Sequence, residues 1–168
     1  IRKIEKRLKR LQKQVNRKYE KNKKGKEYVK TKNIIKLEKQ IQQVYRRLAN
    51  IRSNYLHKTT TSIVKTKPYR VVIEDLAVSD MMKNKHLSDA IRKQGFSEFR
   101  RQLEYKCNFR GIKFVVADRF YPSSKSCSQC GKIKKDLKLK DRVYKCSCGL
   151  NIDRDLNASI NLSKYKSA

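Results

Sequence analysis

The chain has 168 residues, with 45 lysines and arginines against 15 aspartates and glutamates, and its formal net charge is +30. This length excludes a large multidomain protein. Self-repulsion of this size disfavours a compact state unless phosphates neutralise it, so the charge predicts DNA or RNA as the partner. No stretch approaches the roughly 18 apolar residues of a membrane-spanning helix, which disfavours a membrane partner.

Residues 1–66 are predicted to form a basic antiparallel helical hairpin. Two apolar runs carry the pattern: Ile4, Leu8, Leu11, Val15 and Tyr19, then Ile34, Leu37, Ile41, Val44, Leu48, Ile51 and Tyr55. Steps of three and four residues place each run on one face of a helix, and a polar break at 21–26 separates the two. The remaining lysine-rich faces are interpreted as phosphate-binding surfaces, with plain solvation as the alternative.

Residues 67–121 change pattern after Pro68 and are predicted to form a strand, a helix and a second strand. The segments are a strand at 69–76, a polar loop at 79–85, one helix from about 90 that ends at Gly111, and a strand at 112–117. Both strands are rich in β-branched residues, which favours burial. Two strands joined through a helix are predicted to lie parallel.

Four of the five cysteines lie in a short segment, 122–152, which is predicted to be a zinc ribbon. They are Cys127, Cys130, Cys146 and Cys148. Two close pairs, each followed by a glycine that permits a tight turn, can surround one metal ion with four thiolates. Such a site has no position for water or substrate, so its role is structural. Iron is the alternative metal, and the fifth cysteine, Cys107, is interpreted as a small buried apolar residue.

Two acidic groups stand at the ends of predicted elements. Glu74 and Asp75 end the first strand, and Asp153 and Asp155 open a last helix, 153–168, in which Leu156, Ile160 and Leu162 are expected to pack. Solvated acids at a strand end and helix capping explain these groups adequately. The other interpretation is a pair of magnesium ions for phosphodiester hydrolysis, which would need a third carboxylate.

Four segments together resemble the TnpB (OrfB) family. They are 72–76 (Val-Ile-Glu-Asp-Leu), 111–112 (Gly-Ile), 122–131 (Pro-Ser-Ser-Lys-Ser-Cys-Ser-Gln-Cys-Gly) and 153–158 (Asp-Arg-Asp-Leu-Asn-Ala). The family comprises transposon-encoded, RNA-guided DNA endonucleases related to type V CRISPR effectors. The order and spacing of the segments match over essentially the whole chain, including the basic hairpin.

The resemblance implies an α/β fold, a RuvC-like nuclease of the RNase H type with three magnesium-binding acids. Glu74 matches the second acid and Asp155 the third, while Asp75 and Asp153 become neighbours rather than ligands. The zinc ribbon is then an insertion that helps to hold the final helix and contacts nucleic acid. No residue matches the first acid, so the expectation is a partial nuclease fold, the C-terminal half of the parent protein.

The resemblance further implies that the full-length protein cuts DNA, whereas these 168 residues alone are expected to be inactive. The expected partners are DNA and guide RNA, with no small-molecule substrate, in the cytoplasm of a prokaryote, near the nucleoid. The alternative is a truncated or repurposed zinc-ribbon protein that binds nucleic acid without cutting. The sequence predicts no oligomeric state.

Overall fold

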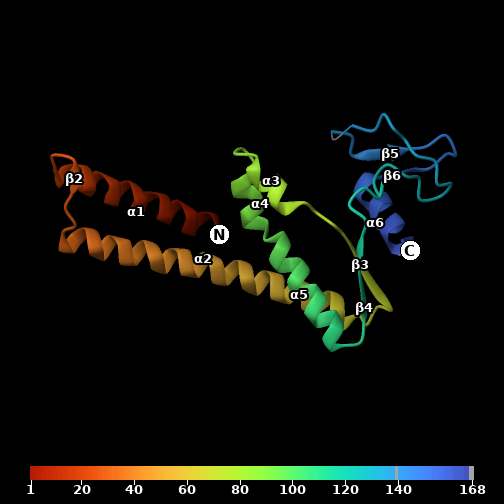
Figure 1. Cartoon of the computed structure of the whole chain (residues 1–168), viewed down its shortest axis with the longest axis horizontal. Coiled ribbons are helices and arrows are strands. Elements are labelled where there is room, and N and C mark those ends of the chain that lie inside the picture. The colour runs from red at the N-terminus through yellow and green to blue at the C-terminus, as the bar shows by residue number, and fades with distance from the viewer. Residues whose placement is uncertain (139, 167–168) are drawn as a thin grey trace. The chain divides into compact units, whose positions relative to one another are not determined.

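The structure is a computed structural model that describes residues 1–138 and 140–166. The chain divides into two compact units, Ile1–Lys58 and Thr59–Ala168. Among the described residues, no helix combines the length and hydropathy that crossing a bilayer requires. Figure 1 labels the helices and strands of both units.

The first unit is an antiparallel pair of helices, α1 (Arg2–Lys21) and the first part of α2 (Lys32–Lys65) (Figure 1). Its buried cluster is Leu8, Leu11, Val44 and Leu48. These residues come from both predicted apolar runs, which confirms that the apolar faces of the two helices pack against each other. Tyr55 departs from the prediction because its side chain is 68% exposed.

Polar contacts between α1 and α2 follow a regular spacing. They join Glu5 to Arg52 (3.2 Å), Gln12 to Tyr45 (2.8 Å) and Tyr19 to Glu38 (2.6 Å). Successive contacts lie seven residues apart on both helices, which is the repeat of two helices packed along a common seam. Between the helices, β1 (Lys23–Lys24) and β2 (Glu27–Tyr28) form a small antiparallel hairpin, which begins inside the predicted polar break at 21–26 and extends two residues beyond it.

The second unit is organised around two parallel strands, β3 (Arg70–Glu74) and β4 (Lys113–Ala117). Glu74 lies opposite Ala117 in the register, so both strands end at the same edge. The parallel pairing is confirmed. The crossover runs through α3 (Val78–Lys83), α4 (Ser88–Gln94) and α5 (Phe96–Phe109).

Two predictions for the crossover are wrong. The predicted loop at 79–85 is largely the helix α3, whose backbone N–H of Met81 donates to the carbonyl of Ala77 (3.0 Å). A short helix with no buried residue has no apolar period to reveal it. The predicted single helix is broken at Gly95, whose φ of 68° closes α4 in the left-handed conformation that glycine adopts at little cost.

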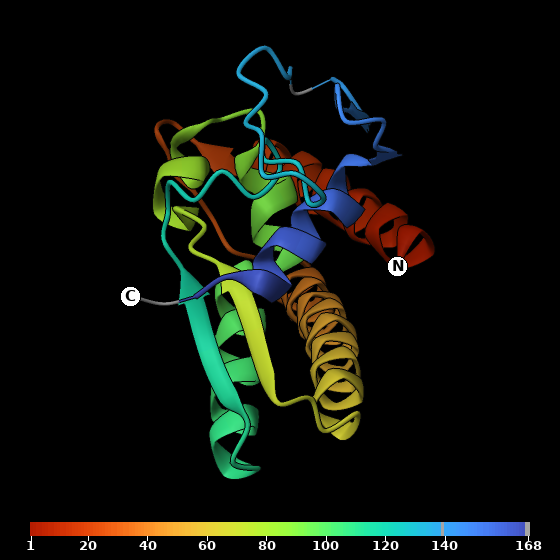
Figure 2. The ribbon, with the colours of Figure 1, turned by 90° about the vertical axis from the view of Figure 1, so that its right-hand side faces the viewer.

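Helices pack on both faces of the strand pair (Figure 2). On one face, Val64 near the end of α2 joins a buried cluster with Leu103, Cys107 and Ile112. Cys107 is fully buried, as predicted, and burial raises the pKa of its thiol. On the other face, residues from β4 and α6 (Arg154–Lys164) meet in a second cluster.

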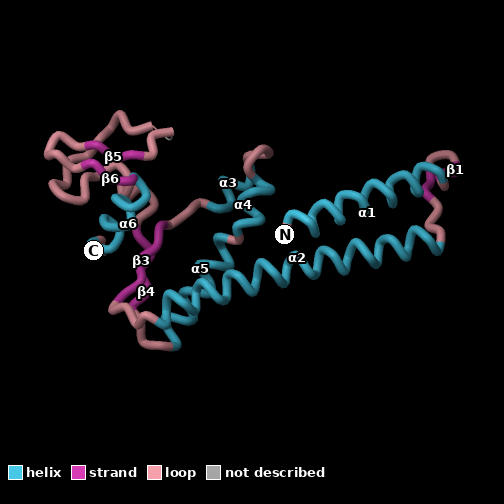
Figure 3. Tube along the Cα trace, turned by 180° about the vertical axis from the view of Figure 1, so that it is seen from behind, coloured by secondary structure: helices cyan, strands magenta, loops and turns pink. Residues whose placement is uncertain are grey.

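The cysteine segment contains two short antiparallel strands, β5 (Val143–Lys145) and β6 (Asn151–Asp153), and β6 leads directly into α6 (Figure 3). Tyr144 of β5 is fully buried, and its hydroxyl lies 3.1 Å from the carbonyl oxygens of both Lys125 and Lys132. This side chain therefore ties the first cysteine loop to the strand pair.

Candidate metal centre and acidic pocket

The four cysteines converge on one point. Their sulfur atoms all lie within 4.8 Å of one another. The Sγ atoms of Cys127 and Cys148 are 3.6 Å apart, and those of Cys130 and Cys146 are also 3.6 Å apart. Four sulfurs bound tetrahedrally at about 2.3 Å from zinc are separated by about 3.8 Å. The donor set and its spacing therefore fit a metal ion such as zinc.

Backbone N–H groups also prepare the sulfurs for a cation. The N–H of Cys148, together with hydrogen bonds from the other three cysteine sulfurs, lowers the pKa of the Cys146 thiol to about 6. The N–H of Leu150 favours the thiolate of Cys148, but burial and bonds to the other three sulfurs raise its pKa to about 12. Thiolates packed this closely repel one another, and a divalent cation would remove that repulsion.

Helix α6 is attached to the first cysteine loop by two buried asparagines. Asn157 is fully buried; its Oδ1 accepts from the N–H of Ser128 (3.0 Å), and its Nδ2 donates to the carbonyl of Ser126 (2.7 Å). Asn161, 6% exposed, donates to the carbonyls of Ser126 and Ser123 at 2.7 Å each. The loop that presents Cys127 is thus held by side chains of the last helix.

Glu74 lies at the end of β3, beside a pocket of about 210 Å³ at the shared edge of the two strands. Its Oε1 accepts a hydrogen bond of 2.6 Å from the hydroxyl of Ser123, a residue that Asn161 also holds. Asp118, which follows β4, lines the same pocket. Glu74 is therefore connected through Ser123 to α6 and to the cysteine loop.

Asp75 turns its carboxylate to two arginines. Arg100 approaches Oδ1 at 3.0 Å and Arg119 approaches Oδ2 at 2.9 Å. This acid is therefore neutralised by partners of its own, unlike a solvated strand-end residue. Asp75 also lines the pocket of Glu74, and its expected place as a neighbour rather than a metal ligand stays a prediction.

Asp153 and Asp155 have different structural roles. Asp153 is the N-cap of α6, and its carboxylate accepts from the backbone N–H groups of Asp155 (2.9 Å) and Leu156 (3.0 Å). The side chain of Asp155 is 75% exposed and lies 3.6 Å from Arg154. Asp155 is not among the residues that line the Glu74 pocket.

The sequence analysis missed the asparagines and expected Leu156 to pack instead. Leu156 is 52% exposed, while Asn157 and Asn161 occupy the buried side of α6. The available signal was their four-residue separation, which places both amides on one helix face. Because the surfaces they meet are backbone carbonyls and N–H groups, amides satisfy them and leucines would not.

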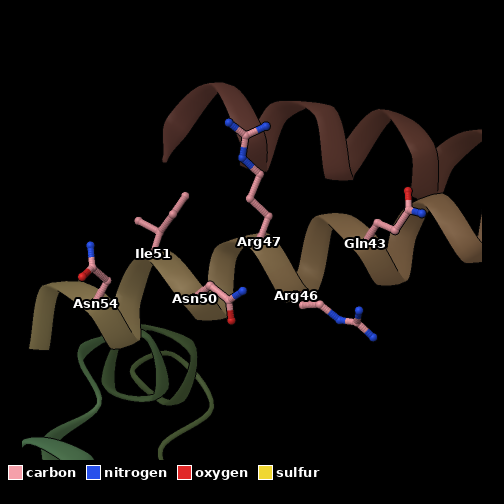
Figure 4. A pocket seen from close by; sticks show the side chains of 6 residues that line it. All are labelled: Gln43, Arg46, Arg47, Asn50, Ile51 and Asn54. Atoms are coloured by element: carbon pink, nitrogen blue, oxygen red, sulfur yellow. The ribbon is translucent and has the colours of Figure 1, made fainter. Parts of the chain in front are cut away.

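A basic groove of about 460 Å³ runs along α2 in the first unit (Figure 4). Its lining comprises Gln43, Arg46, Arg47, Asn50, Ile51 and Asn54. The lining contains no acidic residue, and its amides and guanidinium groups are donors of the kind that can bind anionic oxygens.

The chain thus combines a four-cysteine cluster, the helix α6 that follows it and a parallel strand pair in one α/β unit. Residues 96–162 match the family model described as "Cas12f1-like, TNB domain". Curated relatives show the same likeness. The chain is 41% identical over 127 residues to a "Putative RNA-guided DNA endonuclease" of Streptomyces pristinaespiralis, covering 76% of this chain and 31% of the relative.

Further relatives agree. The chain is 33% identical over 176 residues to the "Putative RNA-guided DNA endonuclease InsQ" of Escherichia coli K12, covering 95% of this chain and 41% of InsQ. It is 31% identical over 136 residues to TnpB-like protein L79 of Acanthamoeba polyphaga mimivirus, covering 77% and 25%. The chain is therefore similar to RNA-guided DNA endonucleases and TnpB-like proteins, and the predicted resemblance is confirmed. It spans between a quarter and about two fifths of the length of these relatives.

The fold is also similar to a solved structure. A chain of the Cas12f1–sgRNA–target DNA complex superposes with a TM-score of 0.60 at 23% identity, over 77% of this chain and 38% of that one. The α/β architecture is thus shared with Cas12f1.

Proposed function

We propose that this chain is the nuclease and zinc-ribbon part of a transposon-associated, RNA-guided DNA endonuclease that hydrolyses phosphodiester bonds with magnesium. The observation that carries the proposal is the place of Glu74. It lies in a pocket at the carboxyl edge of a parallel strand pair, where α/β sheets place reacting groups. The names of the relatives support the same activity.

The proposed division of the chain has four parts. They are a basic hairpin at 1–66, a partial RuvC-like core at 67–121, a zinc ribbon at 122–152 and the terminal core helix at 153–168. In this proposal the strand pair β3–β4, with α5 and α6 on its two faces, is a portion of a RNase H-like sheet.

Glu74 and Asp155 are the proposed magnesium ligands. Carboxylate oxygens suit Mg²⁺, which would polarise a phosphate and activate water when bound. Ser123 would fix the rotamer of Glu74 through its 2.6 Å hydrogen bond. Asp153 would orient Asp155 by capping the helix that carries it.

The four cysteines would hold one structural zinc ion. This ion would stabilise the cysteine loop, through which the positions of Glu74 and Asp155 would be connected. The cysteine loop is bound to α6 through Asn157 and to the Glu74 pocket through Ser123. DNA and guide RNA would bind through the basic surfaces. The formal charge of +30 and the guanidinium-lined groove on α2 favour phosphate contacts that weaken steeply with salt.

The test uses the complete product of the gene that encodes this chain, with its guide RNA and a target DNA. Glu74→Gln and Asp155→Asn should each abolish cutting and leave RNA binding unchanged. Glu104→Gln and Asp136→Asn are matched controls because they make the same chemical changes at acids outside the proposed site, and they should cut normally. Undiminished cutting by either ligand variant would refute the assignment.

A second candidate is a relative that binds nucleic acid without cutting. It is favoured by the exposed position of Asp155 outside the pocket that holds Glu74. In that case the complete product binds RNA and DNA with the same salt dependence, yet no metal concentration produces cleavage. Cleavage that depends on both acids would exclude this candidate.

A further inference from the structure

The turn that follows β4 presents an aromatic ring to solvent. Phe120 is 92% exposed, although phenylalanine is an apolar residue that folding normally removes from water. The backbone N–H of Tyr121 donates to the carbonyl of Asp118 at 3.0 Å. Arg119 and Phe120 are therefore the two central residues of a tight turn.

Both ends of this turn are anchored to the end of α6 and the residue that follows it. The carboxylate of Asp118 accepts a 2.8 Å hydrogen bond from the hydroxyl of Tyr165, which also accepts from the Asp118 N–H (3.2 Å). The rings of Tyr121 and Tyr165 pack edge to face with centroids 4.9 Å apart. The hydroxyl of Tyr121 donates to the carbonyl of Asn161. The backbone that carries Phe120 is thus fixed, so its ring is presented without a large ordering cost.

The residue that precedes Phe120 in this turn is a cation, Arg119. Arg119 is half exposed, is held by Asp75 at 2.9 Å and lines the pocket of Glu74. Arg100 contacts the same carboxylate from α5. Proteins that bind single-stranded nucleic acid combine aromatic rings, which stack on bases, with cations, which meet phosphates, and this turn carries one residue of each kind.

We propose that Phe120 stacks on an unpaired base of a single-stranded nucleic acid, with Arg119 at the adjacent phosphate, at the rim of the Glu74 pocket. The ligand is single-stranded because a base inside a duplex has both faces covered by its neighbours. Stacking is tolerant of base identity, as every base has a π face. The inference rests on the proposed nucleic-acid function but not on cutting.

The chain supplies its own matched control. Phe109, at the end of α5, is 90% exposed, but it precedes β4, whereas Phe120 follows it. Truncation of either ring to alanine removes the same atoms from a similarly exposed position. Neither change should alter folding, because neither ring lies in a buried cluster.

The first experiment measures binding of the purified chain to a short single-stranded DNA oligonucleotide and to its RNA counterpart. Phe120→Ala should weaken binding by about fivefold to a hundredfold, which is the effect of losing one stacked base, while Phe109→Ala leaves it unchanged. With oligonucleotides made entirely of abasic sites, Phe120→Ala should have no effect. Equal losses in the two variants, or an undiminished loss with abasic strands, would overturn the proposal.

The second experiment uses the absence of tryptophan from the sequence. Phe120→Trp and Phe109→Trp each create a single tryptophan fluorophore, and stacking on a base should quench the first but not the second. If the parent chain binds no oligonucleotide, the proposed nucleic-acid function fails and this inference fails with it. If the chain binds but the fluorescence of the Phe120→Trp variant is not quenched, the stacking site alone is refuted. A ring that is buried only when a protein partner is added would also refute it.

Discussion

Asn157→Ala tests how the last helix holds the metal centre. Asn157 is fully buried and makes two hydrogen bonds to the backbone on either side of Cys127. Alanine removes both of them. Because Ser126 and Ser128 flank a metal ligand, the change acts on the fold and on metal affinity together.

The size of the effect follows from what each partner loses. The carbonyl of Ser126 keeps its 2.7 Å bond from Asn161, so it remains satisfied. The N–H of Ser128, a half-buried residue, loses its bond to Asn157. The cost is then about 1 kcal/mol, the low end of the range of about 1–3 kcal/mol that a buried donor without an acceptor costs. In a unit of about this size, 1 kcal/mol shifts the midpoint of thermal unfolding by about 4–8 °C. The expected fall in Tm is therefore about 4 °C or more.

Metal affinity should fall as well, because groups that orient metal ligands typically contribute about 10- to 100-fold to affinity. Thermal unfolding of the zinc-loaded chain and competition with a chromophoric chelator measure the two effects. Asn151→Ala is the matched control, since Asn151 is exposed on β6 in the same ribbon.

Equal Tm and equal zinc affinity for Asn157→Ala and the parent would refute the reasoning. A fall in Tm with unchanged affinity would show that the helix and the metal centre are held independently. A comparable loss in Asn151→Ala would assign the effect to the ribbon strand rather than to the buried amide.

Three further changes test other parts of the molecule. Zinc removal by a chelator should lower the unfolding free energy by about 4 kcal/mol when zinc was present at about 1,000 times its dissociation constant. The variant Cys127→Ser lacks one of the four sulfurs, so the chelator should change its unfolding free energy far less. Leu103→Ala in the core between α5 and the strands should cost about 2–5 kcal/mol in urea unfolding, and Leu156→Ala, at an exposed leucine, much less. Hydrogen bonds from Tyr19 and Lys30 lower the pKa of Glu38 below 4.5, so its stabilising contribution is present above that pH and is lost as pH falls through the folded value. An NMR titration of Glu38 should show the depressed midpoint, and Tyr19→Phe should raise it; an unchanged midpoint would contradict this origin.

The sequence predicted the elements whose apolar residues recur at a regular spacing over many positions. The hairpin stripe was evident because Leu11 and Leu48 belong to runs with uninterrupted helical spacing. The parallel pairing of β3 and β4 followed from the helical segment between them, because two strands of one sheet that are joined through a helix run in the same direction. The helix α3 was missed because a short exposed helix is stabilised by local backbone bonds that leave no periodic trace.

The candidate site also has a part that the sequence predicted and a part that it did not. The cysteines were predictable because coordination fixes both residue type and spacing. The support from Asn157, Asn161 and Ser123 was not, since it depends on which backbone groups the folded chain leaves in need of partners. The anchoring of Phe120 likewise depends on Tyr165, which lies far along the chain.

The seven-residue spacing of the contacts between α1 and α2 restricts how this hairpin can change in length. Insertion of seven residues into each helix adds one repeat and returns every later contact to its partner. Insertion of three or four rotates the outer part of the seam away from its neighbour. The length of this basic hairpin can therefore change only in steps of about 10 Å, because seven helical residues rise about 1.5 Å each.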